Sequence, residues 1–121
     1  MTRKIGYFSE KIIKLLGLSI PPGTPILIGD SNIKHIKDRH PYEYEQYFSD
    51  IESILLSPDY VGINKRNGSI DFVKEYIIVG NHIQVSVRVN PGGAYYARTM
   101  FALMSYKLNR SLANGSLLPV P

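Results

Sequence analysis

Histidines are the side chains in this sequence best suited to proton transfer near neutral pH, and there are three of them, His35, His40 and His82. His35 and Arg39 are four residues apart, so a helix would place them on one face. His35 and His40 are five apart and would point about 140° away from each other on the same helix. Because that pair is poorly placed to chelate a metal ion and no acidic cluster accompanies it, we expect neither a bound metal nor another cofactor.

The residues around His35 are mostly cationic. Lys34, Lys37 and Arg39 surround the histidine, while two isoleucines provide the apolar contacts of the same segment. A single histidine on a helix usually only packs or faces solvent. The neighbouring cations favour a functional role, because an imidazole among positive charges is suited to chemistry on a phosphate group.

Further basic residues lie in apolar segments of the second half of the sequence. Arg98 and Thr99 lie inside an apolar run over residues 95–101, and an arginine there must meet an acid, solvent or an anion, because burying it unpaired costs too much. Lys74 lies in a similar run, with the alternative of pairing with acidic neighbours on a sheet. Arg88 occupies an outward position in an alternating segment, where a solvated charge is the simpler interpretation.

Alternation alone does not decide whether these cations share one face of a sheet. In regular strands Lys74 would lie on the side of Phe72, and Arg98 on the side of Tyr96 and Met100. Whether the two sides coincide depends on the pairing register and on any bulge, which the sequence leaves open.

These residue types are sufficient for cleavage of RNA without a metal ion. The reaction needs a base for the 2′-hydroxyl proton, an acid for the leaving 5′-oxygen, and cations or donors for the charged phosphoryl group. Histidine, lysine, arginine and threonine can supply these functions. The nine tyrosines also offer faces on which unpaired bases could stack, although we expect most of them in the core.

The composition is that of an ordinary globular chain with a basic surplus. Of 121 residues, 44% are hydrophobic and 20% are charged, and the net charge is +4. Residues 42–59 hold five acids and no lysine or arginine, whereas residues 60–121 hold seven basic residues and two acids. This segregation favours a positive side that attracts phosphate, although a merely soluble basic protein would have the same totals.

Several classes of protein are excluded by the same composition. Cysteine is absent, so disulfides and thiolate metal sites are ruled out. No apolar run approaches the length of a membrane span, and the N-terminal residues do not continue as a classical signal peptide. We therefore expect a cytoplasmic protein of a bacterial or phage-infected cell, without membrane contacts.

Helix signals are concentrated in the first half of the chain. The patterns predict helices over residues 9–16, 32–39 and 41–56, and a short strand or extended segment over residues 26–28. Ser9 can cap the first helix and Gly17 can end it. The second helix would carry His35 and end before Pro41, which disfavours helical geometry in the residue that precedes it.

The second half is typical of an antiparallel meander. Alternating and apolar runs separated by turn residues predict strands over residues 60–64, 70–78, 83–89 and 95–103. The third of these strands would direct its β-branched residues inward and Gln84, Ser86 and Arg88 outward. A helix over residues 105–113 and a loose tail from about residue 115 would follow.

Helices followed by strands indicate one α+β domain over residues 1–121, with its core over about residues 24–103. We expect the N-terminal helices to pack on one face of a twisted, roughly four-stranded antiparallel sheet. The other face of that sheet would then be free to hold a site.

Five segments resemble a known family in their order and approximate spacing. They are DSNIKHIKDRHP (30–41), SPDYVG (57–62), GSIDFVKE (68–75), VSVRV (85–89) and YARTM (96–100). Together they resemble the phage-associated family of barnase–EndoU–colicin–RelE-like nucleases (PBECR) over about residues 24–103. The resemblance implies an α+β ribonuclease fold, metal-independent cleavage of RNA, and a setting in phages, mobile elements or toxin systems.

The same resemblance implies roles for individual residues. It indicates His35 as a catalytic acid or base and Thr99 as a hydrogen-bond donor. Lys74 and Arg98 would be catalytic cations that bind the phosphate. The further candidates for substrate binding are Lys34, Arg39, His40, Arg88 and Tyr96. Which of His35 and His40 would transfer the proton stays open.

Two functions fit these observations. The first is a metal-independent endoribonuclease, a toxin or phage effector, that cleaves RNA such as tRNA through attack of the 2′-hydroxyl and has an antitoxin or immunity protein as a partner. The second is a catalytically inactive nuclease-like module that binds RNA or inhibits a host protein. Harmless expression without an immunity partner, together with salt-sensitive RNA binding and no cleavage, would favour the second.

Overall fold

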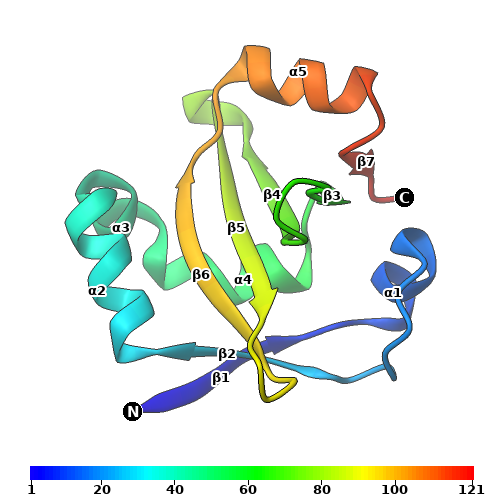
Figure 1. Ribbon diagram of the computed structural model, residues 1–121. Coiled ribbons are helices and arrows are strands. Elements are labelled where there is room, and N and C mark those ends of the chain that lie inside the picture. Colours follow the sequence, from blue (N-terminus) through cyan, green and yellow to red (C-terminus); the bar gives the residue numbers. More distant parts are fainter.

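A seven-stranded mixed sheet forms the centre of the computed structural model, which describes residues 1–121 (Figure 1). Its strands are β1 (Thr2–Tyr7), β2 (Pro25–Gly29), β3 (Tyr60–Ile63), β4 (Ile70–Tyr76), β5 (Asn81–Val89), β6 (Tyr95–Ala102) and β7 (Leu118–Pro119). The helices are α1 (Glu10–Leu16), α2 (Asp30–Arg39), α3 (Pro41–Tyr47), α4 (Ile51–Leu56) and α5 (Ser105–Ala113), with the single 3₁₀ turns η1 (Phe48–Asp50) and η2 (Ile77–Val79).

The fold class is α+β, as expected, but the sheet is larger than four strands and is not purely antiparallel. Its strand order is β1-β2-β6-β5-β4-β3-β7, and β2 and β6 are parallel neighbours. The predicted meander is present as β3 to β6 at the centre. The outer strand β1 escaped prediction because Ile5 is its only buried residue, so it carries almost no apolar pattern.

The first helix was predicted correctly from its two ends. Ser9 Oγ accepts a hydrogen bond from the backbone N–H of Ile12 at 3.2 Å, and Gly17 ends α1 in the left-handed conformation with a φ of 67°. The helix that carries His35 begins two residues earlier than expected, at Asp30. Gly29 is its cap, and the Asn32 side chain accepts a hydrogen bond from the Gly29 N–H at 2.9 Å.

The helix predicted over residues 41–56 is broken into α3, η1 and α4. The backbone leaves helical geometry at Tyr47, whose φ is −127° and ψ −8°. This bend keeps Tyr47 and Ile51 buried in one core although α3 lies next to α2 and α4 lies behind the sheet (Figure 1). A straight helix with the same apolar face could not contact both surfaces, so tertiary packing overrides the uninterrupted pattern.

The main core lies between the sheet and α4. It consists mainly of aliphatic residues, and α4 packs against β1, β4 and β5 on the face turned away from the viewer in Figure 1. Helix α2 lies at the side of the sheet, next to β2 and β6, and places Ile36 in the same core. Helix α5 covers part of the opposite face, where Leu108 packs with Val73 and Leu117. The helices are therefore not confined to one face.

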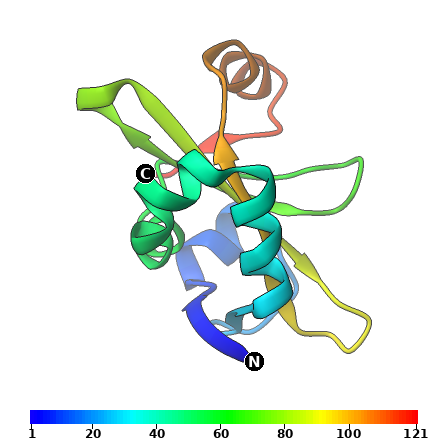
Figure 2. The ribbon, with the colours of Figure 1, turned by 90° about the vertical axis from the view of Figure 1, so that its left-hand side faces the viewer.

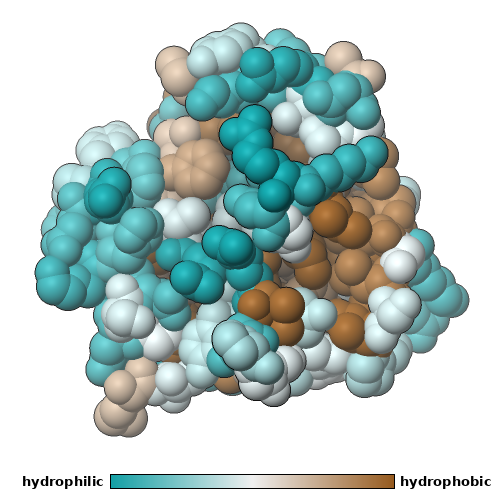
Figure 3. All heavy atoms as spheres, in the orientation of Figure 1, coloured by the Kyte–Doolittle hydropathy of each residue, from teal (hydrophilic) through white to brown (hydrophobic).

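On the face of the sheet that is turned toward the viewer in Figure 1, the surface that no helix covers lies between α2 and α5. Figure 2 shows that the 64–69 turn (green) and the 90–94 turn (yellow) both project on this side, where they flank the exposed strands. Hydrophilic side chains cross the middle of this face in Figure 3. The expectation that the other face of the sheet is free is therefore correct only for the region between α2 and α5, because α5 covers part of that face.

The C-terminal tail is held in place, contrary to the expectation of a loose end. Strand β7 pairs with β3, and Leu117 is buried. The backbone N–H of Val120 donates to the Asp59 carbonyl at 2.9 Å, and Lys11 Nζ donates to the Pro121 carbonyl at 2.9 Å. These contacts come from residues far away in the sequence, so local composition could not reveal them.

Gly62 allows the C-terminal segment to cross β3. A Cβ at this position would overlap the carbonyl oxygen of Ser116 and lie 3.1 Å from the Leu117 Cα. We expect Gly62→Ala to lower the free energy of unfolding by about 3 kcal/mol, because the obstacle is backbone and cannot rotate away. Urea unfolding monitored by circular dichroism measures this. Gly92→Ala, in an open turn, should change the same quantity by no more than about 0.5 kcal/mol, and equal stability of the two variants would contradict this packing.

Candidate active site

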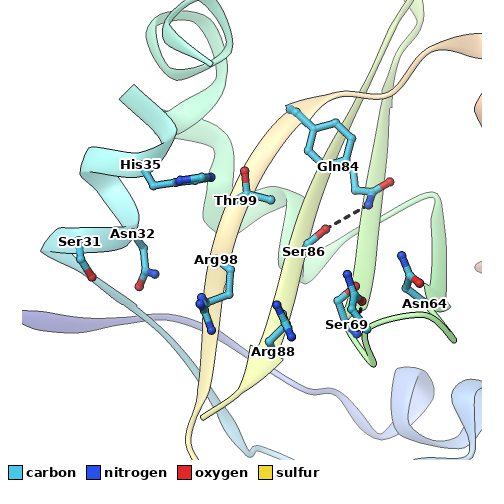
Figure 4. Close-up of a pocket in the computed structure, with 12 residues that line it drawn as sticks. Ser31, Asn32, His35, Asn64, Ser69, Gln84, Ser86, Arg88, Arg98 and Thr99 are labelled. Atoms are coloured by element: carbon cyan, nitrogen blue, oxygen red, sulfur yellow. Dashed lines mark hydrogen bonds between the residues drawn. The ribbon is translucent and has the colours of Figure 1, made fainter. Parts of the chain in front are cut away.

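A polar cavity of about 540 Å³ opens between α2, the exposed face of β5 and β6, and the 64–69 turn (Figure 4). Phe101 is the only hydrophobic residue among those that line it. The side chains that are suited to catalysis or to phosphate binding are His35 from α2, Arg88 from β5, and Arg98 and Thr99 from β6. The cavity therefore brings His35 of α2, which we call the histidine helix, close to the neighbouring residues Arg98 and Thr99 of β6.

A β-bulge places Arg98 and Thr99 together in this cavity. Opposite β5, Ala97 pairs with Val87 and Thr99 pairs with Ser86, so Arg98 is one extra residue in β6. Ala97 and Met100 are buried in the main core on either side of the pair. Arg98 and Thr99 consequently face the cavity as neighbours, whereas regular alternation would send one of them into the core. The expectation that Arg98 shares a side with Met100 is wrong for this reason.

His35 extends from α2 toward Thr99 (Figure 4). Helix α2 packs against β6 through its buried Ile36, which directs the preceding residue, His35, to the open side. The imidazole is exposed and makes neither an ion pair nor a hydrogen bond within the protein. Both of its ring nitrogens are therefore free to exchange a proton with a bound molecule.

Thr99 presents an unpaired hydroxyl at the same place. Its Oγ1 is the only buried side-chain oxygen or nitrogen without a hydrogen-bond partner. Most buried polar groups in proteins are paired, so such an atom requires an explanation. Rotation of the Thr99 side chain would turn this hydroxyl toward a ligand oxygen in the cavity.

Two arginines give the cavity its charge. Arg98 and Arg88 extend from the neighbouring strands β6 and β5 and are both exposed (Figure 4). Neither forms an ion pair with an acidic side chain. The first turn of α2 also lines the cavity with Ser31 and Asn32, at the positive end of the helix dipole. The site is thus suited to an anion.

The floor of the cavity is a buried polar row on β4 and β5. Gln84 Nε2 donates to Ser86 Oγ at 3.1 Å, and Ser69 Oγ donates to the Asp71 carboxylate at 2.9 Å. Asp71 pairs across the strands with Ser86, which in turn pairs with Thr99. Burial raises the pKa of Asp71 above its ordinary value of 3.8, and the hydroxyls of Ser69 and Ser86 partly oppose this rise.

The raised pKa of Asp71 predicts a dependence of stability on pH. Between 3.8 and the raised value the folded protein binds more protons than the unfolded chain, so this carboxyl makes folding less favourable as pH rises through that interval. Asp71→Asn removes the titration. Its free energy of unfolding relative to the wild type should therefore increase as pH rises from 3.8 through the raised pKa of Asp71 in urea titrations. A difference that does not change with pH for Asp71→Asn would contradict the assignment.

Lys74 is not brought to this cavity. It lies on the core side of β4 with Phe72, and its Nζ donates to the carbonyl of Ser57 at 2.8 Å. Ser57 follows the last turn of α4, where a cation interacts favourably with the helix dipole. The expected convergence of Lys74 with His35 and Arg98 is therefore wrong, because the residues lie on opposite faces of the sheet.

Two other cations of the histidine helix are also outside the cavity wall. Lys34 Nζ is 2.6 Å from Asp38 Oδ2, and this contact lowers the pKa of Asp38. Arg39 is exposed one turn beyond His35 and does not line the cavity. Neither position supports the substrate contact expected from the sequence.

His40 and Tyr96 lie near the cavity but do not line it. The His40 ring is 5.8 Å from the Phe101 ring, and its Nδ1 is 3.9 Å from Glu43 Oε2. The same Glu43 oxygen accepts a hydrogen bond from the Ala102 N–H at 3.1 Å, so His40 joins α2 and α3 to the end of β6. Tyr96 lines a smaller adjoining cavity of about 440 Å³, which also contains Arg98.

Several residues that line the cavity were not identified from the sequence. Asn32, Ser69 and Phe101 were not singled out, and Gln84 and Ser86 were recognised only as outward-facing. The alternation that placed Arg88 outward applies equally to Gln84 and Ser86, so the same signal could have identified both. Phe101 had no such signal, because it lies beyond the bulge.

Two further observations concern other classes of site. No group of three or more histidine, cysteine, aspartate or glutamate side chains lies close enough together to hold a metal ion. None of the helices is long and apolar enough to cross a membrane.

The comparisons with known proteins gave one family match. The family model described as phage-Barnase-EndoU-ColicinE5/D-RelE like nuclease3 matches residues 3–110. No curated protein and no solved structure matched the chain. The matched region contains the histidine helix, the central strands with the bulge, and most of α5.

Proposed function

The chain belongs to the phage-Barnase-EndoU-ColicinE5/D-RelE like nuclease family, and we propose that it is an endoribonuclease that cleaves RNA at the cavity around His35 and Arg98. The observation that carries this proposal is the convergence of three groups on one open cavity: an unpaired imidazole, an unpaired arginine and an unpaired threonine hydroxyl. These are the functions that phosphodiester cleavage requires.

Arg98 and Arg88 bind the scissile phosphate in this proposal. Two guanidinium groups from adjacent strands can donate several hydrogen bonds to non-bridging phosphate oxygens. Neither arginine forms an ion pair with an acidic side chain, so no ion pair within the protein has to break when the phosphate binds. The Thr99 side chain rotates when the phosphate binds, and its hydroxyl, which has no partner in the free protein, then donates a further hydrogen bond.

His35 acts as the general base. It accepts the proton of the 2′-hydroxyl, the 2′-oxygen attacks phosphorus, and the bond to the 5′-oxygen breaks. The leaving oxygen takes a proton from solvent, which has access through the open side of the cavity. The products are a 2′,3′-cyclic phosphate and a 5′-hydroxyl. Arg98 stabilises the additional negative charge that develops on the phosphoryl group.

The proposal extends to the substrate and to the setting of the reaction. The attack uses a 2′-hydroxyl, which selects RNA over DNA. The cavity arginines supply the positive charge, so the mechanism needs no metal ion. We place the activity in the cytoplasm of a bacterial or phage-infected cell, where the protein acts as a toxin or phage effector and an antitoxin or immunity protein would bind over the cavity.

Incubation of the purified protein with tRNA and total RNA in the presence of a chelator tests the proposal. We expect discrete cuts whose 5′ fragments end in 2′,3′-cyclic phosphates. Binding that weakens with salt but produces no cuts would contradict it, and would instead support a nuclease-like module that holds RNA without cleaving it. Products with 3′-hydroxyl and 5′-phosphate ends would contradict the role assigned to the 2′-hydroxyl.

A further inference from the structure

We infer that the cavity beneath α5 is a second nucleotide subsite, which binds the nucleotide next to the scissile phosphate of a single-stranded RNA. This inference rests on the proposed function, because it takes the cavity around His35 as the place of cleavage. To the proposed function the inference adds the path that the RNA chain follows beyond the scissile phosphate and the residues that bind the RNA along that path.

The cavity beneath α5 is larger than the cavity around His35 and shares part of its lining. Its volume is about 690 Å³, and it lies between α5, the 64–69 turn and the ends of β4 to β6. Asn64, Gln84 and Phe101 line both cavities. A chain bound at Arg98 can therefore continue into the space beneath α5 without leaving the surface.

Four cations surround this space. Lys65 and Arg66 come from the turn, and Lys107 and Arg110 come from α5, where their spacing of three residues places them on one helix face. All four are exposed and none forms an ion pair. The only acid in the lining, Asp71, is 8% exposed and hydrogen-bonded to Ser69. The rim is thus an unpaired positive cluster suited to a phosphate.

The interior of the cavity is suited to a base. Phe101, at the boundary of the two cavities, offers an aromatic ring beside which a base can stack. The amide groups of Asn64 and Gln84 can exchange hydrogen bonds with a base edge. An acidic protein surface would use the rim cations but would have no need of an aromatic ring within a polar cavity, so these features favour a nucleotide.

Binding of a labelled 2′-deoxy oligonucleotide, which the proposed reaction cannot cut, tests the inference. The double variant Lys107→Ala/Arg110→Ala is compared with Arg3→Ala/Lys4→Ala, which removes two exposed and unpaired cations from β1, outside the cavities. Each lost phosphate contact should reduce the dependence of log K on log salt by about 0.7. We expect a reduction of about 1.4 for the α5 variant, together with about 25-fold weaker binding at about 0.1 M salt. The β1 variant should match the wild type.

The outcomes separate this inference from the proposed function. Both variants should cleave a dinucleoside monophosphate, which has no phosphate for the cavity beneath α5, at the wild-type rate. An unchanged salt dependence in the α5 variant would overturn the inference even if RNA is cleaved. Absence of RNA cleavage by the wild type would overturn the proposed function, while a selective loss of oligonucleotide binding in the α5 variant would still support the subsite.

Discussion

Replacing His35 with alanine is expected to lower the rate of RNA cleavage by at least about a hundredfold, because general base catalysis contributes roughly 10²- to 10⁴-fold to such reactions. His35 is the only histidine in the cavity, and it points toward the unpaired Thr99 hydroxyl. No other side chain in the lining ordinarily exchanges a proton near neutral pH. The rate constant for cleavage of a short oligoribonucleotide at saturating protein measures the effect.

Two histidine variants provide the comparison. His82 lies outside the cavity, with its Nε2 3.4 Å from Glu75 Oε2, so His82→Ala should cleave at the wild-type rate if it folds. His40→Ala removes the contact with Phe101 but no group that faces the substrate, so we expect a smaller loss than in His35→Ala. If His40→Ala were the inactive variant and His35→Ala retained activity, the assignment of the base would be wrong.

Arg98→Ala is expected to lower cleavage by about 10²- to 10³-fold, the loss typical when one group that stabilises transition-state charge is removed. Arg98 occupies the extra position of the bulge and has no acidic partner, so its guanidinium is free to bind the phosphate. Arg98→Lys should recover only part of the activity, because an ammonium group cannot match two phosphate oxygens with a planar pair of donors. The same oligoribonucleotide assay measures both variants.

A matched arginine is available in the edge strand β1. Arg3 in β1 is exposed and lies outside the three cavities described, with its guanidinium 6.0 Å from the Phe48 ring. Arg3→Ala changes the net charge by the same amount and should leave cleavage unchanged. Equal losses in Arg3→Ala and Arg98→Ala would indicate a general effect of charge and would exclude a specific phosphate contact.

Much of the fold could be predicted because its signals are local. Ser9 and Gly17 define α1, and the helix over residues 105–113 was predicted at the bounds that α5 has. The central strands alternate or are continuously apolar, and an Asn-Gly turn separates β3 from β4. Strands β1 and β7 lie at the edges of the sheet and pair with partners that are distant in the sequence, so no local pattern marks them.

The candidate site was predictable only in part, and the bulge explains why. The sequence singled out His35, Arg98 and Thr99, and the structure brings all three to one cavity. Lys74 is at an equally apolar position, but regular alternation places it on the core side of β4. Arg98 and Thr99 can both face the cavity, between Ala97 and Met100 in the core, only because the register shifts by one residue. A register shift depends on pairing with β5, which no single strand encodes.

A DNA oligonucleotide that contains one ribonucleotide tests the central claim most directly. With the wild-type protein in chelator, we predict a single cut on the 3′ side of the ribose, a 2′,3′-cyclic phosphate end, and no such cut with His35→Ala. Cleavage of the all-deoxy strand, or equal cleavage by the wild type and His35→Ala, would contradict attack by a 2′-hydroxyl that His35 deprotonates.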